Sequence, residues 1–529
     1  MNAFRKALTA LLAACLLMAP AGYAGGSNDH GDHDNQIKHI LLISIDGMHA
    51  LDLSNYVISH PESTLAFLSG HGVTYTNNST SSPSDSFPGL AALVTGGSPT
   101  TTGFWYDVTY NRGVSPPAQT TPFPITGGAN LCPSVIGTPV AMDESIDFDL
   151  TKLDGGGGIN SNFVPRDPQT CLPILPHQYL RVNTIFEVVR ANGGRTAWVD
   201  KHPSYEWTNG PSGKGVQDFY GPEINSIPVP LPQYQGCNPV PFPDPGFDDG
   251  WTTDLNNIKC YDSLHVTAVL NQIDGFSHDR SSKPGVPTLF GMNFQAVSVG
   301  EKLAGSGYTD VLGTPSAGLA GELDFVDQSL GQMVSELKKT GHYDSTLIII
   351  TAKHGQSPID VQKLHPIGGG QPATLIGASE AFDISDDGSL IWLTSPSLTP
   401  SVVQLLSNPQ SQQTLGIQEI FALQSLENKY NSPLNDPRTP DIILKVNTGV
   451  IFTGGSKIAE HGGLNEDDVH TALLVSSPSF SQQTVKTPTS NQQVAPTILK
   501  FLGIDPNELQ AVKKEQIKVL PFLFRDSDN

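Results

Sequence analysis

The apolar positions of the chain alternate between strand-like runs and helix-like stripes. The run His39–Ile45 is almost entirely apolar and ends at Asp46, and the run Thr346–Thr351 ends just before Lys353 and His354. Such runs are typical of strands buried on both faces of a parallel sheet. Apolar residues also repeat at helical spacing between the two runs, at Leu323, Val326, Leu330, Val334 and Leu337. The alternation predicts an α/β fold, with a mostly parallel sheet sandwiched by helices.

Two later apolar runs, 441–446 and 471–475, predict further strands in this pattern. Ligands of open parallel sheets bind beyond the carboxyl ends of the strands. Asp46 and His354 both follow predicted strands, so we expect them to share a site.

The first 36 residues have the composition of an export signal followed by a polar terminus. Residues 1–24 combine Arg5 and Lys6 with a short apolar core and a small-residue cleavage site, and residues 25–36 are polar and Gly-rich. This pattern predicts a periplasmic or extracellular protein with a flexible mature N-terminus. The apolar core is too short to span a bilayer, so we expect no membrane span.

Four cysteines remain after the signal: Cys132, Cys171, Cys237 and Cys260. An even number in an exported chain predicts disulfides. Three pairings are possible, and we favour Cys132–Cys171 with Cys237–Cys260 because neighbours in sequence close the smaller loops. Buried free thiols are the alternative.

Two segments rich in proline and glycine, 108–180 and 203–262, interrupt the α/β pattern and contain all four of these cysteines. We interpret them as cap insertions in a catalytic domain spanning 37–505, with 506–529 as a C-terminal tail. The formal charge of −22 argues against binding a nucleic-acid polymer, which requires clustered Lys and Arg. A small anionic ester in a locally positive pocket stays compatible with this charge.

Four short motifs contain candidate catalytic residues: ISIDGMH with Asp46, SPSDSFPG with Ser86, TAKHGQSP with His354 and AEHGGLN with His461. Each has a structural explanation when taken alone, since Asp and Ser cap helices and His often completes a turn. A strand-end Asp, a helix-start Ser and two His-Gly loops together indicate ligands around one site.

Together these motifs resemble the type I phosphodiesterase/nucleotide pyrophosphatase group of the alkaline phosphatase superfamily, over about Lys38 to Ile504. The resemblance implies a phosphoester hydrolase in which two zinc ions activate a hydroxyl nucleophile that becomes phosphorylated. Carried over to this chain, Ser86 is the nucleophile. Asp46 and His354 would hold the metal ion beside it, and His461 would hold the other.

The chain departs from the family pattern at several metal-binding positions. Lys353 stands where the family has Asp, and Gln295 and Val299 align with an Asp and a His. We therefore expect one zinc-type ion rather than two, held by Asp46, Ser86 and His354, with His461 or Glu460 completing its shell.

Metal-independent chemistry is the alternative. Lys353 would then supply positive charge where an ion would otherwise lie, paired with Asp46 and Asp107. Asp107 also aligns with a family Asn that contacts the phosphoryl group, so it is a candidate substrate-binding residue.

Lys201 and His202 open the second cap segment and are candidates for binding an anionic substrate. Tyr205 and Trp207 follow them, and their simplest interpretation is the core of the cap.

The sequence as a whole predicts an exported phosphodiesterase or nucleotide pyrophosphatase-like hydrolase acting on a small-molecule phosphoester. Two alternatives stay open. One is a non-catalytic binding protein that has lost its metal centre, and the other is a sulfatase or phosphotransferase of the same superfamily.

Overall fold

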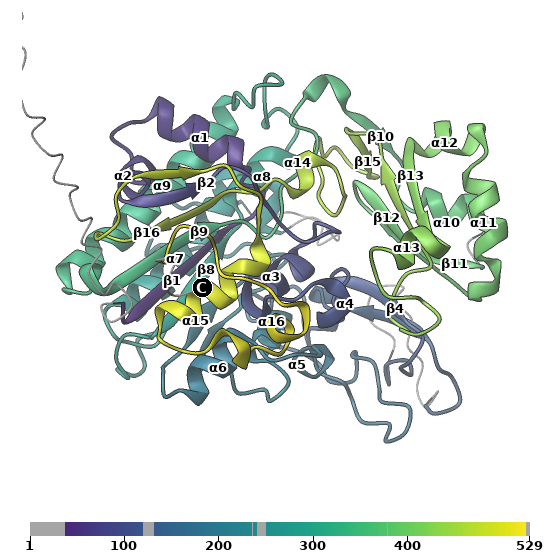
Figure 1. Ribbon diagram of the computed structural model, residues 1–529, viewed down its shortest axis with the longest axis horizontal. Helices are drawn as coiled ribbons and strands as arrows, with labels where there is room; N and C mark the ends of the chain where they lie inside the picture. Colours follow the sequence, from purple (N-terminus) through teal and green to yellow (C-terminus); the bar gives the residue numbers. More distant parts are fainter. Residues whose placement is uncertain (1–36, 120–131, 235, 241–249, 378, 525–529) are drawn as a thin grey trace, which may run out of the picture. The chain divides into compact units, whose positions relative to one another are not determined.

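Eight strands form the central sheet, in the order β17-β2-β16-β9-β1-β8-β6-β7 (Figure 1). In that order they span Gln483–Val485, Gly72–Tyr75, Leu473–Ser476, Thr346–Thr351, His39–Ile45, Leu289–Phe294, Ala197–Val199 and Asp218–Tyr220. The five strands from β9 to β7 are mutually parallel, whereas β16 runs antiparallel to β9. The predicted α/β fold with a mostly parallel sheet is confirmed.

The coordinates come from a computed structural model that describes residues 37–119, 132–234, 236–240, 250–377 and 379–524. The predicted export signal (1–24) and polar terminus (25–36) lie outside the described residues. No helix in the described ranges is long and apolar enough to cross a membrane.

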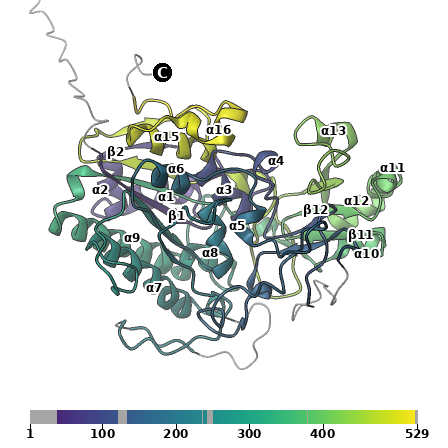
Figure 2. The same cartoon turned by 90° about the horizontal axis from the view of Figure 1, so that it is seen from below.

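Helices cover both faces of the sheet, as Figure 2 shows for α6, α15 and α16 on one side and α7 and α9 on the other. The first face packs against α3, α6, α15 and α16, which span Ser86–Thr95, Ile185–Ala191, Val494–Phe501 and Gln510–Glu515. The second packs against α1, α2, α7, α8 and α9, which span Ala50–Ser59, Thr64–Gly70, Leu255–Ile273, Ala296–Lys302 and Ala317–Lys339. Successive residues of β1 enter opposite cores, Ile40 on the first face and Leu41 on the second, because side chains alternate along a strand.

The C-terminal segment from residue 506 contributes to the core, although we interpreted it as a tail. It contains η8 (Pro506–Glu508) and α16, and Leu509, Ala511 and Val512 are buried in the first core. Its short length and its lysines concealed this apolar face in the sequence.

A second, antiparallel sheet has the order β11-β12-β14-β13. Its strands span Ala381–Ser385, Gly388–Leu393, Ile442–Val446 and Ile417–Ala422, and the helices α10 to α13 around it span Gln371–Ile376, Thr399–Leu406, Pro409–Leu415 and Leu423–Glu427. The run 441–446 thus lies outside the central sheet. Buried apolar strands look alike in sequence whichever sheet they join, which is why the pattern alone placed this run with the parallel strands.

The remaining elements are short. The pairs β4–β5, β10–β15 and β3–β18 span Val108–Asn111 with Thr138–Ala141, His365–Ile367 with Val450–Phe452, and Asn78–Ser79 with Thr489–Ser490. The short helices α4, α5 and α14 span Pro99–Thr102, Pro176–Tyr179 and Glu466–Val469. The 3₁₀ helices η1 to η7 span Glu144–Ile146, Pro203–Asn209, Trp251–Thr253, Tyr343–Ser345, Val361–Lys363, Pro396–Leu398 and Asn491–Gln493.

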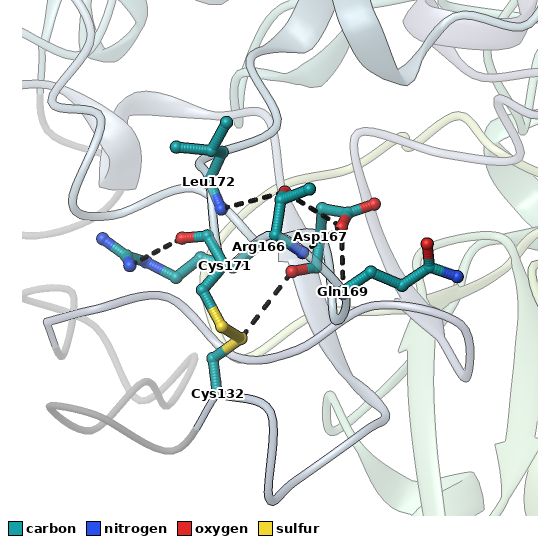
Figure 3. Close-up of a disulfide and its surroundings, with 7 residues drawn as sticks. Cys132, Arg166, Asp167, Gln169, Cys171 and Leu172 are labelled. Carbon is teal, nitrogen blue, oxygen red and sulfur yellow. Dashed lines mark hydrogen bonds between the residues drawn. A yellow bond between two sulfur atoms is a disulfide. The ribbon is translucent and has the colours of Figure 1, made fainter.

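Both predicted disulfides are present, Cys132–Cys171 and Cys237–Cys260. Figure 3 shows the first, where Arg166 donates a hydrogen bond to the carbonyl oxygen of Cys171 (2.8 Å). The second joins a loop to α7, a helix of the central fold, so the boundary that we placed at residue 262 falls inside this helix.

Candidate functional site

Four neighbouring parallel strands deliver polar side chains to one edge of the central sheet. Asp46 follows β1, Gln295 follows β8, Lys353 and His354 follow β9, and Lys201 follows β6. Because these strands are adjacent and parallel, their carboxyl ends meet at the same edge.

Ser86 enters this edge as the first residue of α3. Asp85 is the N-cap and accepts a hydrogen bond from the backbone N–H of Phe87 (2.9 Å), which leaves the Ser86 hydroxyl free for other contacts. The helix packs closely against the segment that follows β9. A side chain on Gly89 would not fit there, because its Cβ would lie 2.1 Å from the carbonyl oxygen of Lys353. Glycine at this position therefore allows Ser86 to approach Lys353 and His354.

The Ser86 hydroxyl lies between a base and a cation. Its Oγ is 3.1 Å from Nε2 of His354 and 2.9 Å from Nζ of Lys201. Nδ1 of His354 donates to the carbonyl oxygen of Gly355 (3.0 Å), so Nε2 of the neutral ring carries the lone pair. Burial lowers the pKa of His354, although the Asp46 carboxylate acts in the opposite direction. The neutral ring can accept the hydroxyl proton of Ser86.

Asp46 is completely buried and is held by hydrogen-bond donors on both oxygens. Oδ1 accepts from the amide of Asn293 (2.8 Å) and Oδ2 accepts from the amide of Gln295 (2.7 Å). Burial alone would raise the pKa of the Asp46 carboxyl, but the positive charges of Lys353 and Lys201, together with the neighbouring His354 ring, outweigh it and hold the pKa well below its usual range. Asp46 is thus a fixed negative charge beside two ammonium groups.

Lys353 is fully buried and lies beside one of its two expected partners, Asp46, but not beside the other. Nζ lies 2.7 Å from Oδ1 of Asp200 and 3.9 Å from Oδ2 of Asp46, and it sits 4.2 Å from the centre of the Tyr205 ring. The expected pairing with Asp107 is wrong, since Asp200, which follows β6, takes that place.

Asp107 lies near Asp85 and forms no ion pair with Lys353 within the described residues. Burial, and then the charge of Asp85, raise the pKa of Asp107 well above its usual value. Its assignment as a phosphoryl contact stays a prediction.

Tyr205 and Trp207 are core residues, as expected, but they belong to the core on the first face of the central sheet rather than to a separate core of the cap. Both are fully buried, and their rings pack against Phe87 at centroid distances of 4.8 and 6.0 Å.

Lys201 is the residue whose position the sequence indicated least well. We assigned it to substrate binding from the cap, but its ammonium contacts Ser86 and lies 3.5 Å from both Asp46 Oδ2 and Gln295 Oε1. The available signal was the apolar triplet Ala197–Val199 followed by Asp200, which is strand β6 with a polar strand end. Three residues are too few for a reliable strand prediction.

The two other predicted site histidines have separate environments. The His461 ring lies against the His354 ring in a tilted arrangement, with centroids 3.9 Å apart, and its buried Nδ1 has no hydrogen-bond partner within the described ranges. Burial, and then His354, lower the pKa of His461 well below its ordinary value. His202 instead pairs with Glu223, with 2.8 Å between Nδ1 and Oε2. Burial, and then the charge of Lys201, lower the pKa of His202 to about 3.

The residues at the edge of the sheet do not fit a two-zinc centre. Gln295 donates its amide to Asp46, and Val299 is buried in an apolar cluster with Trp251 and Tyr261. Glu460, a candidate to complete a shell, is paired with Lys302 at 3.1 Å.

The positions of other donor groups support this assessment. Among the described residues, two groups gather three metal-binding atoms within 4.8 Å: His49, Asp52 and Glu301, and Glu144, His202 and Glu223. The donors of Asp46, His354 and His461 do not form such a group. Two ammonium groups beside Asp46 supply the positive charge there.

Comparison with known proteins shows which parts of the chain are shared. Residues 40–122 and 241–470 match the family model described as type I phosphodiesterase/nucleotide pyrophosphatase. The bis(5'-adenosyl)-triphosphatase enpp4 of Xenopus laevis is 25% identical over 190 residues, which cover 35% of this chain but only 39% of that relative.

Solved structures share the fold over most of the chain. The murine ectonucleotide pyrophosphatase/phosphodiesterase 5 superposes with a TM-score of 0.54 at 13% identity, covering 88% of this chain and 96% of the murine chain. That murine protein was also solved in an inactive form in complex with AMP. The alkaline phosphatase PafA superposes with a TM-score of 0.58 at 14% identity, covering 89% of this chain and 96% of the other. These similarities establish an alkaline phosphatase-like fold.

Proposed function

The chain belongs to the type I phosphodiesterase/nucleotide pyrophosphatase family, and from this premise we propose that it is an exported phosphodiesterase-type hydrolase whose nucleophile is Ser86. One observation carries the proposal: the Ser86 hydroxyl contacts both the unprotonated nitrogen of His354 and the ammonium of Lys201. A hydroxyl between a base and a cation is arranged for nucleophilic attack.

In the first step, Ser86 Oγ attacks the phosphorus of the ester while its proton moves to His354 Nε2. The bond between phosphorus and the leaving oxygen breaks, and the phosphoryl group stays on Ser86. The Lys201 ammonium, 2.9 Å from Oγ, stabilises the negative charge that develops as the proton leaves. The imidazolium is stabilised by Asp46, whose Oδ2 lies 3.5 Å from Nε2.

In the second step, water attacks phosphorus from the side that the leaving group vacated. The bond between phosphorus and Oγ breaks, Oγ regains the proton from His354, and the proton lost by water passes to solvent. His354 thus acts as base and then as acid on the same oxygen, as reversal of the first step requires.

The substrate class that suits this arrangement is a nucleotide-like diester or pyrophosphate. A phosphate leaving group departs as a stable anion and needs no proton from the side opposite Ser86. The names of two relatives point the same way, one being a bis(5'-adenosyl)-triphosphatase and the other having been solved with AMP.

Export is part of the proposal and is supported by two kinds of observation. The disulfides Cys132–Cys171 and Cys237–Cys260 are of a type that persists in oxidising compartments. Residues 1–24 have the composition of an export signal.

The test compares wild type and Ser86→Ala on diadenosine triphosphate, bis-p-nitrophenyl phosphate, p-nitrophenyl phosphate and p-nitrophenyl sulfate. We expect turnover of the diesters or the dinucleotide by wild type, and a loss of about 10⁴-fold or more in Ser86→Ala. Mass spectrometry after an acid quench should find the phosphoryl group with its remaining ester substituent on the peptide that contains Ser86, which is an adenylyl group when the substrate is diadenosine triphosphate. Turnover of the sulfate alone, or full activity in Ser86→Ala, would overturn the proposal.

A further inference from the structure

A second cluster of ionisable side chains lies beside the catalytic edge and takes no part in the reaction described above. It consists of Glu144, Asp147, His202 and Glu223, which are 5%, 2%, 8% and 0% exposed. We call it the Glu144 cluster. Its members come from three separate segments: the 3₁₀ helix η1 and its end, the loop after β6, and the loop after β7.

The donor atoms of this cluster converge on one point. Glu144, His202 and Glu223 each offer an atom, and these atoms lie within 4.8 Å of one another. Both carboxylate oxygens of Asp147 are buried without a hydrogen-bond partner, and the side chain interacts directly with Glu223. A buried carboxyl group that receives no hydrogen bond and lies against Glu223, one of three convergent donors, indicates a missing ligand, since buried polar groups in folded proteins are otherwise paired.

The charge of the cluster indicates that this ligand is a cation. Three carboxyl groups are buried together, and in the described parts of the chain no lysine or arginine forms an ion pair with any of them. Burying an uncompensated carboxylate is costly, and three in contact repel one another as well. A divalent cation at the point of convergence would neutralise most of this charge.

The donor set selects the kind of cation. Calcium and magnesium prefer shells made of oxygen, whereas zinc and similar ions bind a mixture of imidazole and carboxylate. One histidine with three carboxylates fits the second group. A cavity of about 600 Å³ is lined by Pro203 and Pro222, the sequence neighbours of His202 and Glu223.

We propose that Glu144, Asp147, His202 and Glu223 bind one zinc-type divalent cation, which fastens together the three segments that position Lys201. His202 is the next residue after Lys201, and the backbone N–H of Ile224, next to Glu223, donates to the carbonyl oxygen of Lys201 (3.0 Å). An ion shared by His202 and Glu223 would therefore fix the peptide that directs the Lys201 ammonium at Ser86.

The other candidate group, His49 with Asp52 and Glu301, has a different character. His49 Nδ1 lies 2.9 Å from Asp52 and 2.8 Å from the hydroxyl of Tyr308, and Tyr308 also donates to Glu301 (2.7 Å). This group contains no carboxylate without a hydrogen-bond partner, such as Asp147 in the Glu144 cluster, so it gives no indication of a bound ion.

The experiment measures zinc bound by the full mature protein after equilibrium dialysis, using three variants beside wild type. The double variant Glu144→Gln/Glu223→Gln removes two donors of the cluster. The double variant His354→Ala/His461→Ala removes the imidazoles of the catalytic edge, and Glu206→Gln alters a half-buried cap carboxylate that pairs with His177. All proteins share His30 and His33 of the polar N-terminal segment, so differences between them report on the altered sites.

We expect the Glu144→Gln/Glu223→Gln protein to bind one zinc ion fewer per chain than wild type, and the other two variants to retain that ion. Cobalt substitution should give visible absorption bands in wild type that are lost in the same variant. Equal zinc binding by wild type and Glu144→Gln/Glu223→Gln, or loss of the ion in His354→Ala/His461→Ala, would overturn the proposal.

Thermal denaturation distinguishes loss of the metal ligands from unfolding of the variant. Without metal, Glu144→Gln/Glu223→Gln should melt no lower than wild type, because amides relieve the repulsion between buried carboxylates. Added zinc should raise the melting temperature of wild type and leave that of the variant unchanged. A variant that melts lower without metal and still gains stability from zinc would contradict the assignment.

Discussion

The parts of the chain that match the family model and the part that does not make different contributions to the site. Residues 40–122 and 241–470 match, and they supply Asp46, Ser86, His354 and His461. The unmatched stretch 123–240 supplies Asp200 and Lys201, and it contains the whole Glu144 cluster. The proposed nucleophile and its proposed base therefore belong to the matched segments, whereas the lysine that contacts Ser86 comes from the unmatched stretch.

The contacts of Asp46 join these two regions. Lys353 and Lys201 lie 3.9 and 3.5 Å from its Oδ2. Lys353 comes from a matched segment but is held by Asp200 from the unmatched one. The matched and unmatched regions thus contact each other at the site. Substitutions at these contacts should show which residues affect stability and which affect catalysis.

The largest effect is expected where the two regions are joined by the fully buried pair of Lys353 and Asp200. Lys353→Met leaves Asp200 buried without its cation, so the free energy of unfolding should fall by about 3–5 kcal/mol. Urea denaturation monitored by tryptophan fluorescence measures this change. The double variant Lys353→Met/Asp200→Asn should recover a large part of the loss, because it removes the charge left unpaired. A double variant no more stable than the single one would show that the pair is not the main cause.

The next effect concerns the cation from the unmatched region. Lys201→Met should leave stability close to wild type and lower kcat by about 10²–10³-fold, because the developing charge on Ser86 Oγ loses its stabilising ammonium. Steady-state kinetics on the best diester measures it, with Lys214→Met as an exposed-lysine control from the same stretch. A change in KM alone would instead support our first interpretation, in which Lys201 only binds substrate.

The sequence predicts a site residue when that residue follows an apolar run long enough to be identified as a strand. Strands β1 and β9 are long, buried apolar runs, and the polar residues after them identified Asp46 and His354. Strand β6 has only three residues, so the same reasoning did not place Lys201 at that edge. The pairing of Lys353 with Asp200 joins residues 153 positions apart and depends on strand order, which no local pattern encodes.

The pH dependence tests the matched segments themselves. His354 must be neutral to accept the Ser86 proton, and burial lowers its pKa from the ordinary 6.5. We therefore expect kcat/KM to rise with pH through a midpoint below pH 6.5 and then to level off. Asp46→Asn removes a charge that favours the imidazolium, so its midpoint should move to lower pH. A midpoint that moves upward in this variant would exclude His354 as the base.

The lowered pKa of His354 also makes the free energy of unfolding depend on pH, and proton linkage gives the direction of this dependence. Because the folded-state pKa of His354 lies below the unfolded value, the unfolded chain binds more protons near pH 6. The stability that the neutral His354 contributes is therefore present above pH 6.5 and is lost as the pH falls towards the pKa of His354 in the folded protein. Wild type should lose more stability than His354→Gln between pH 7 and pH 5, as urea denaturation at each pH would show.

The smallest effect links the Glu144 cluster to catalysis within the unmatched region. If the bound ion only positions Lys201, Glu144→Gln/Glu223→Gln should lower kcat by about 3–10-fold, a coupling of the size measured between residues that share a network. The decisive measurement is the same double substitution in a Lys201→Met background, where no ammonium remains to be positioned and no further loss is expected. An equal loss of kcat in both backgrounds would mean that the Glu144 cluster affects the site through the general stability of the fold. The proposal that the cluster positions Lys201 would then be wrong.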